Sequence, residues 1–286
     1  MSSDITAFFH APSSTYSYVI ADPATGRAAV LDAALDYDAA SGRSGIGSAQ
    51  KLVEHVKTRG YGVDWILETH AHADHLSAAQ FIKKELGGKV AIGEGIRDVQ
   101  ATFKKLYNLG KDFPADGRQF DHLFKDGESF RIGSLPVQVL AMGGHTSDGV
   151  AYVVEDAAFV GDSLFMPDSG SARCDFPGGD AGKLYDSVRR LLDLPGATRL
   201  FMCHDYAPGG REHRNQTTVD EQRLSNIHVK DGVSREDFIK LRQGRDATLP
   251  VPALLLPAIQ VNIRAGNFPE PEADGAVYLK IPLDRL

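Results

Sequence analysis

A run of seven residues, Thr69-His70-Ala71-His72-Ala73-Asp74-His75, holds three histidines and one aspartate. Histidine is neither a good core filler nor a favoured surface residue, so a cluster of this density indicates a shared ligand. Imidazole nitrogen and carboxylate oxygen are donors that transition metals take in proteins. Scattered loop histidines would be the alternative, but five of the chain's ten histidines fall at positions suited to a metal. The run therefore predicts a metal site.

The segments on either side of this run predict how it is positioned. Residues 63–68 are mostly apolar and rich in strand-forming types, which predicts a short strand. Residues 76–87 predict a helix that Gly87 closes. The run is thus expected on a strand-to-helix loop, where α/β folds usually carry their sites.

Further residues of the metal-binding type stand where other predicted strands end. They are His145 after a strand at 135–140, Asp162 after a strand at 157–160, and His204 after a strand at 198–203. Strand ends on one edge of stacked sheets converge, so residues far apart in the sequence can meet there. The pattern predicts an α/β fold of the αββα type, in which two mixed sheets lie between helix layers.

The remaining pattern predicts a single domain. Helices are expected from a Ser48 cap to Gly60 and over 180–194, and a loop is expected over 36–47. No low-complexity tract or flexible linker marks a second domain. Residues from about 222 to 286 are interrupted by prolines. They are predicted to form a C-terminal extension packed on the core of one domain, residues 1–286.

Composition restricts the partners and the location of the protein. The formal charge of −7 comes with no long basic stripe, which argues against a nucleic-acid partner. No apolar run is long enough to cross a membrane, and the first residues lack a secretory signal, so a cytoplasmic protein is expected. Cys174 and Cys203 have no CxxC spacing, which excludes a zinc ribbon. The sequence leaves a homodimer open.

The candidate metal residues, in this order and at strand ends, resemble the metallo-β-lactamase superfamily, from about residue 16 to about residue 206. The residues that carry the resemblance are His70, His72, Asp74, His75, His145, Asp162 and His204. Several further segments resemble the bacterial persulfide dioxygenases, a glutathione-linked and glyoxalase II-like family. These segments are residues 67–79, 161–168, 172–178, 200–206 and 261–266.

The resemblance implies one Fe(II) per chain, held by His70, His145 and Asp162. The implied reaction is the oxidation of glutathione persulfide by O₂ and water to glutathione and sulfite. The resemblance leaves four residues as supporting groups around the ligands: His72, Asp74, His75 and His204.

The same residues leave other activities open. All seven residues of a dinuclear zinc pattern are present, so two Zn²⁺ ions and a glyoxalase II-type thioester hydrolase form the alternative. A metal-dependent sulfur or redox sensor without turnover is the alternative outside the enzymes.

Substrate residues are predicted less directly. Glutathione carries two carboxylates, and arginine can bind a carboxylate through two parallel hydrogen bonds. Arg173 matches the arginine of the glutathione-linked families, although Gly170-Ser171-Ala172 replaces the Gly-Cys-Gly that often precedes it. Tyr206, two residues after His204, is expected to donate its hydroxyl to substrate or oxygen. Further pocket candidates, otherwise solvated surface arginines, are Arg211, Arg214 and Arg264.

Overall fold

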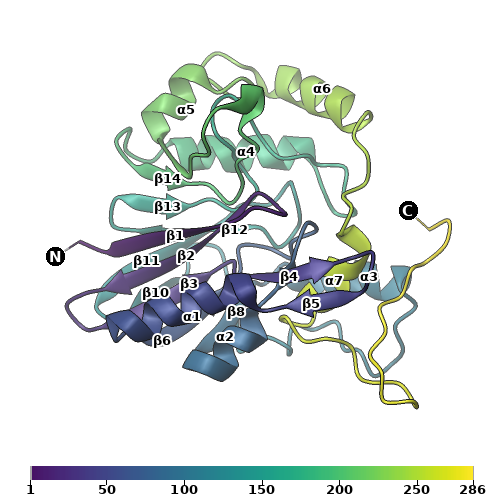
Figure 1. The fold of residues 1–286 in the computed structure, drawn as a ribbon. Coiled ribbons are helices and arrows are strands. Elements are labelled where there is room, and N and C mark those ends of the chain that lie inside the picture. Colours follow the sequence, from purple (N-terminus) through teal and green to yellow (C-terminus); the bar gives the residue numbers. More distant parts are fainter. Residues whose placement is uncertain (1, 286) are drawn as a thin grey trace.

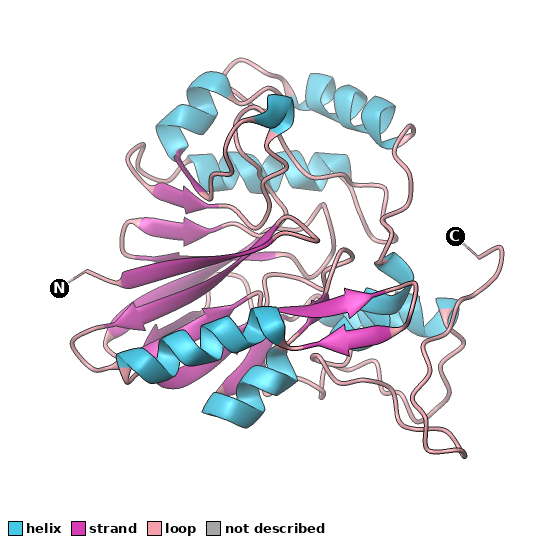
Figure 2. Ribbon diagram, viewed as in Figure 1, coloured by secondary structure: helices cyan, strands magenta, loops and turns pink. Residues whose placement is uncertain are grey.

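The computed structural model describes residues 2–285, and its strands form three sheets (Figures 1 and 2). The N-terminal sheet has the strand order β1-β2-β3-β6-β8-β9. Its first three strands are antiparallel and the remaining pairs are parallel. The strands are β1 (Asp4–His10), β2 (Thr15–Asp22), β3 (Arg27–Leu31), β6 (Gly62–Leu67), β8 (Lys89–Gly93) and β9 (His122–Phe124).

The C-terminal sheet has the order β10-β11-β12-β13-β14-β15 and is antiparallel except for the pair β13–β14. Its strands are β10 (Ser129–Ile132), β11 (Leu135–Ala141), β12 (Val150–Val154), β13 (Ala157–Phe159), β14 (Arg199–Phe201) and β15 (Gln216–Thr218). A small third sheet joins β5 (Arg43–Gly45), β4 (Ala34–Asp38) and β7 (Leu76–Ser77). Both large sheets therefore mix parallel and antiparallel pairs.

The helices cover the outer faces of the two large sheets. One layer packs on the N-terminal sheet: α1 (Gly47–Arg59), α2 (Ala79–Leu86), α3 (Ile96–Leu106) and α7 (Leu255–Asn262). The other layer packs on the C-terminal sheet: α4 (Ala181–Leu192), α5 (Val219–Ser225) and α6 (Arg235–Asp246). A short 3₁₀ turn spans Pro208–Gly210. In Figure 1, α4, α5 and α6 lie on one side of the strands, and α1 and α2 lie on the other. The predicted αββα sandwich is confirmed.

Large side chains fill the space between the two sheets. Tyr18, Leu67 and Phe124 lie on strands of the N-terminal sheet. Tyr152 and Phe159 face them from the C-terminal sheet. The hydroxyl of Tyr18 donates to the carbonyl of Met202, 2.6 Å away, so this polar atom stays satisfied inside the core. This packing fixes the relative position of the strand ends from which the site is built.

Two local predictions around the first helix were wrong. The segment 36–47 is not a plain loop but contains the hairpin of β4 and β5. Ser48 does not cap α1 with its side chain. Instead, a carboxylate oxygen of Asp36 on β4 accepts the Ser48 backbone N–H at 3.1 Å. The helix start is thus satisfied from a neighbouring strand, which the local sequence does not reveal.

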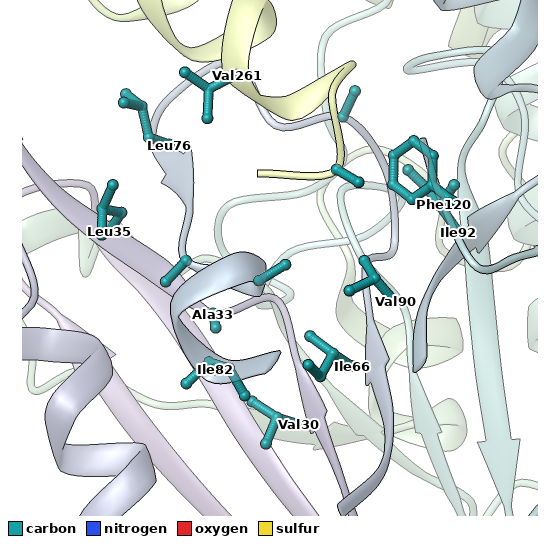
Figure 3. Close-up of a cluster of buried hydrophobic side chains, with 14 of the residues drawn as sticks. Val30, Ala33, Leu35, Ile66, Leu76, Ile82, Val90, Ile92, Phe120 and Val261 are labelled. Atoms are coloured by element: carbon teal, nitrogen blue, oxygen red, sulfur yellow. The ribbon is translucent and has the colours of Figure 1, made fainter. Parts of the chain in front are cut away.

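The helix predicted after the metal run begins later than expected. Leu76 and Ser77 form β7 and pair with β4, and α2 begins only at Ala79. Figure 3 shows Leu76 in the apolar core beside Val261, which belongs to α7 near the C-terminus. The metal run therefore leads into a strand that is covered by the C-terminal region of the chain.

The C-terminal region holds three helices that the sequence analysis did not predict, namely α5, α6 and α7. Pro257 lies in the first turn of α7, where its missing N–H costs no hydrogen bond. Among residues 2–285, no helix combines the length and apolar character that crossing a membrane would need.

Candidate metal centre

Loops at the ends of four strands carry the candidate ligands to one edge of the sandwich. His70 follows β6 of the N-terminal sheet, whereas His145, Asp162 and His204 follow β11, β13 and β14 of the C-terminal sheet. An isolated bridge between His204 and Thr15 at the start of β2 joins the two sheets at this edge. Residues that are distant in the sequence meet here.

The ligand atoms of His70, His145 and Asp162 lie within 4.8 Å of one another. The Nε2 atoms of His70 and His145 are 3.9 Å and 3.8 Å from Oδ2 of Asp162. A transition metal placed about 2.0–2.2 Å from each donor would fit between atoms at this separation. All three side chains are at most one-tenth exposed. The arrangement suits a single ion bound on one face.

Hydrogen bonds hold both imidazoles with Nε2 directed at this point. Nδ1 of His145 donates to the carbonyl of Arg173 at 2.7 Å. Nδ1 of His70 lies 3.0 Å from the Thr69 hydroxyl, which itself donates to Asp32 at 2.9 Å, so the ring nitrogen is the donor. A proton on Nδ1 leaves the Nε2 lone pair free, which is the tautomer that a metal requires.

The site also holds buried polar atoms that no other group satisfies. Within residues 2–285, Nε2 of His70, Nε2 of His204 and Oδ1 of Asp162 are buried without a hydrogen-bond partner. Such atoms cost stability unless a ligand meets them. Burial, and then the neighbouring imidazoles, set the pKa of His70 well below its ordinary value, so its ring is neutral and able to bind a cation. The residues fit a metal ion.

His72 points to a different set of partners. Its Nε2 is 3.0 Å from Oδ1 of Asp32 and 3.5 Å from Oε2 of Glu68, and all three side chains are buried. Burial opposes protonation of the ring, but the charge of Asp32 and its hydrogen bond outweigh it and raise the pKa of His72 well above its ordinary value. Its Nδ1 has no partner within the described chain, and His72, Asp74 and His75 form a second group with ligand atoms within 4.8 Å.

His204 stands between the two groups. Its Nε2 is 3.3 Å from Oδ1 of Asp162 and 3.6 Å from Oδ2 of Asp74. The Thr15 hydroxyl donates to Asp74 at 3.1 Å and lies 3.3 Å from Nδ1 of His204, which fixes the ring. Burial would raise the pKa of Asp74, but the charges of His204 and His75 lower it to about 2, so it remains a carboxylate.

Two glycines position the loops that carry His145 and Asp162. Gly144 has φ of +133° and Gly161 has φ of +53°, values that side-chain-bearing residues rarely adopt. A Cβ on Gly144 would lie 2.3 Å from the backbone nitrogen of Leu184 in α4, and one on Gly161 would lie 2.8 Å from Cβ of Thr69. The residue before each ligand must therefore be glycine for the loops to approach so closely.

A cavity of about 350 Å³ opens onto the metal group. Its wall combines both parts of the chain: Ala73, Asp74, His145, Asp162, Phe165, Ser169, Ser171, Ala172, Arg173, Phe176, Tyr206, Arg242, Arg245, Leu249 and Pro252. The C-terminal region thus supplies one side of the cavity, and the strand-end loops supply the other. Its size suits a small organic substrate.

The predicted substrate residues fall in different places. Tyr206 lines the cavity, and its ring is stacked on His204 with centroids 5.8 Å apart. The side chain of Tyr206 is 55% exposed, but desolvation of its hydroxyl raises the pKa of Tyr206 to about 12, so the hydroxyl stays a donor. Arg173 also lines the cavity, but two of its nitrogens bind Asp175 at 2.6 Å and 2.7 Å and a third donates to the carbonyl of Pro250. Most of its capacity is already used.

The other predicted arginines do not reach the cavity. All five N–H groups of Arg211 are used, on Asp168, Asp205 and the carbonyl of Glu212. Arg214 pairs with Glu221 at 3.5 Å. Arg264 packs over the ring of Phe113 and lines a separate cavity. These three residues therefore stabilise loops and the C-terminal region.

The sequence analysis missed two cavity arginines, both on α6. Arg242 is buried and donates to Asp246 through Nε at 3.0 Å and to the carbonyl of Ser171 at 3.0 Å. Arg245 is exposed, and no carboxylate of the described residues lies within 4.0 Å of it. Their spacing of three puts both on one side of a helix, but the helix itself was not predicted.

Comparisons with known proteins agree with this geometry. Residues 10–204 match the sequence profile of the metallo-beta-lactamase superfamily. A probable metallo-hydrolase of Burkholderia pseudomallei is 49% identical over 99% of this chain and 99% of its own. Glyoxylase B2 of Dictyostelium discoideum is 50% identical over 99% of this chain and 97% of its own.

More distant proteins also match along most of the chain. Mitochondrial persulfide dioxygenase ETHE1 of Bos taurus is 29% identical over 90% of this chain and 87% of its own. The crystal structure of ETHE1 from Myxococcus xanthus superposes with a TM-score of 0.73 at 29% identity, and it covers 92% of this chain and 100% of that one.

Proposed function

The chain belongs to the metallo-β-lactamase superfamily, and from this premise we propose that it is a non-haem Fe(II) persulfide dioxygenase. In the proposed reaction, glutathione persulfide, O₂ and water give glutathione, sulfite and two protons. One observation carries the proposal: two imidazoles and one carboxylate, from His70, His145 and Asp162, converge on a point beside the cavity. Two histidines and one carboxylate on one face are the ligand set of non-haem Fe(II) oxygenases.

In a site with one metal, His72 and Asp74 would be supporting groups. Nε2 of His72 is engaged by Asp32, and a carboxylate oxygen of Asp74 accepts the Thr15 hydroxyl, so both side chains are held beside the ligands. There they would orient the ligands and hold charge near them. The similarity to persulfide dioxygenase ETHE1 along 90% of the chain agrees with this interpretation.

Bound Fe(II) would supply the redox chemistry that joins persulfide sulfur to O₂, which zinc cannot supply. The chain's own residues bind the substrate and orient it. The protonated hydroxyl of Tyr206 donates a hydrogen bond to the substrate at the cavity wall, while Phe165 and Phe176 limit the access of water. Holding both reactants beside one another removes much of the entropic barrier.

A glyoxalase II-type hydrolase with two zinc ions is the second candidate. The observation that favours it is the second group of His72, Asp74 and His75, whose ligand atoms also lie within 4.8 Å of one another. The relatives named glyoxylase B2 and metallo-hydrolase agree with hydrolysis. Asp162, whose Oδ2 faces His70 and whose Oδ1 faces His204, would then help to hold both ions, and these would activate water for hydrolysis.

Metal content and turnover together separate the candidates. Protein purified without oxygen should contain one iron per chain and consume O₂ when glutathione persulfide is added. The same preparation should not cleave S-lactoylglutathione. Two zinc ions per chain with thioester cleavage and no O₂ uptake would replace the dioxygenase with the hydrolase. Binding of persulfide with no turnover of either substrate would instead support a metal-dependent sulfur or redox sensor.

The location and assembly of the protein belong to the proposal as well. We expect a cytoplasmic enzyme that acts on small molecules as a single domain, with no nucleic-acid partner. A homodimer would be recognised by sedimentation of the metal-loaded protein.

A further inference from the structure

We propose that Arg245 on α6 binds a carboxylate of the thiol substrate and so selects anionic persulfides. The inference rests on the proposed function, since it concerns the substrate of the same cavity. Arg245 lines this cavity together with His145 and Asp162. It adds a role for the C-terminal region that the metal residues do not imply.

The charges of the cavity wall single out Arg245. Arg173 is neutralised by Asp175, and Arg242 is neutralised by Asp246. Among residues 2–285, no carboxylate lies within 4.0 Å of Arg245, whose side chain is exposed. It is therefore the cavity arginine whose charge remains available to a ligand.

Arg245 and the metal group line the same cavity. A substrate whose sulfur lies at the metal group therefore has the rest of its body in this cavity. A carboxylate on that body can be bound by Arg245, whose guanidinium offers two parallel N–H donors.

The helix that presents Arg245 is anchored to the loop beside the metal group. The Arg242 guanidinium donates to the carbonyl of Ser171 at 3.0 Å. The carboxylate of Asp246 accepts the backbone N–H of Cys174 at 2.8 Å. Both contacts lie on the segment whose Arg173 carbonyl holds His145 at 2.7 Å. The backbone of Arg245 thus has a fixed position relative to the metal ligands, as the backbone of a specificity residue requires.

The test compares Arg245→Ala and Arg245→Lys with Lys240→Ala, which removes the same charge from an exposed position of α6 that does not line the cavity. O₂ uptake is measured with glutathione persulfide and with the persulfide of glutathione dimethyl ester. Arg245→Ala should raise KM for glutathione persulfide by about tenfold to about hundredfold, with kcat and iron content unchanged. Arg245→Lys should recover part of this loss. With the ester, Arg245→Ala and the unaltered protein should have similar KM values.

An unchanged KM in Arg245→Ala, as in Lys240→Ala, would overturn the inference while leaving the dioxygenase intact. If the unaltered protein consumes no O₂ with any persulfide, the proposed function fails. Calorimetric titration of the metal-loaded protein with glutathione then tests carboxylate binding by Arg245 independently of turnover. Weaker binding of glutathione by Arg245→Ala would support the carboxylate site, and equal binding would overturn it.

Discussion

The protein itself orients the three candidate ligand side chains for binding a cation. Backbone and hydroxyl groups hold Nδ1 of His145 and of His70, and these contacts leave Nε2 of each ring directed toward Asp162. His204, by contrast, faces carboxylates on two sides, Asp74 and Asp162. The residues of the site therefore divide into those that would bind the ion and His204, which lies against the neighbouring carboxylates.

This division predicts different outcomes for two substitutions. Asp162→Ala should reduce iron content at least about tenfold, because it removes a ligand. His204→Ala should retain most of the iron and lose activity by about tenfold to about hundredfold, which is typical of groups that orient ligands. Elemental analysis and O₂ uptake measure the two effects. Full iron content in Asp162→Ala would contradict the ligand assignment.

At the residue scale, the sequence identified metal-type residues better than substrate residues. The dense run around His70 and the strand-end positions of Asp162 and His204 carry a strong local signal. The free donors of an arginine depend on tertiary neighbours, and Asp168 and Asp205 occupy Arg211 from other loops. The sequence around Arg245 does not mark it as a binding residue. Its charge is available only because, among the described residues, the fold places no carboxylate close to it.

At the scale of elements, α7 holds the metal loop in place. Oδ1 of Asn262 accepts the backbone N–H of Ser77 at 2.8 Å. Its Nδ2 donates to the carbonyls of His72 and His75 at 2.8 Å and 2.9 Å. Asn262 is buried, so these backbone groups have no water to replace it. The helix near the C-terminus thus satisfies the loop that carries the histidine run.

Asn262→Ala should therefore lower both stability and metal affinity. Leaving several buried backbone groups unsatisfied costs about 2–4 kcal/mol of the free energy of unfolding. Asn267→Ala, at an exposed position just beyond α7, should change it by less than about 0.5 kcal/mol. Urea denaturation and chelator competition measure the two quantities. Equal stability of the two variants would contradict the role of Asn262.

A second connection, between the loop at 169–172 and the segment after α5, depends on pH. The backbone N–H of Ser171 donates to Nδ1 of buried His228 at 2.9 Å. Burial, then the charges of Arg242 and Arg245, lower the pKa of His228 from 6.5 to about 4. Its stabilising contribution is therefore present above about pH 6.5 and is lost as the pH falls toward about 4, because the unfolded chain binds the proton first.

His228→Gln keeps an acceptor but does not titrate, so its unfolding free energy should fall less steeply over this pH range. Denaturation at a series of pH values measures the slope. Identical slopes for the two proteins would show that His228 makes no such contribution.

Elements with a strong periodic pattern were predicted better than those that depend on distant partners. The helix ending at Gly60 and the strand β13 follow from local pattern. The strand β7 forms because β4 lies beside it, and α7 contains a proline that suggests a loop. In both cases the neighbour that decides the structure lies far away in the sequence.

At the scale of the molecule, the candidate ligands come from both sheets. His70 extends from the N-terminal sheet, and His145 and Asp162 extend from the C-terminal sheet. A bound ion would join the two halves of the sandwich and stabilise the folded state only.

Removal of the metal should therefore lower Tm. At free metal about one hundred times Kd, the stabilisation is about 2.7 kcal/mol, which corresponds to a shift of about 4–5 °C for a chain of this length. Thermal unfolding with and without a chelator measures it, and Asp162→Ala serves as the control that should not respond. An unchanged Tm in the chelated protein would contradict a metal that bridges the sheets.

The contact between Asn262 and the histidine run has a consequence for biosynthesis. A ribosome completes the run long before it reaches Asn262, since 190 residues separate His72 from its partner. The nascent chain consequently exposes its histidines before the side chain that fixes their backbone exists. The finished geometry of this loop becomes available only after residue 262 has left the ribosome.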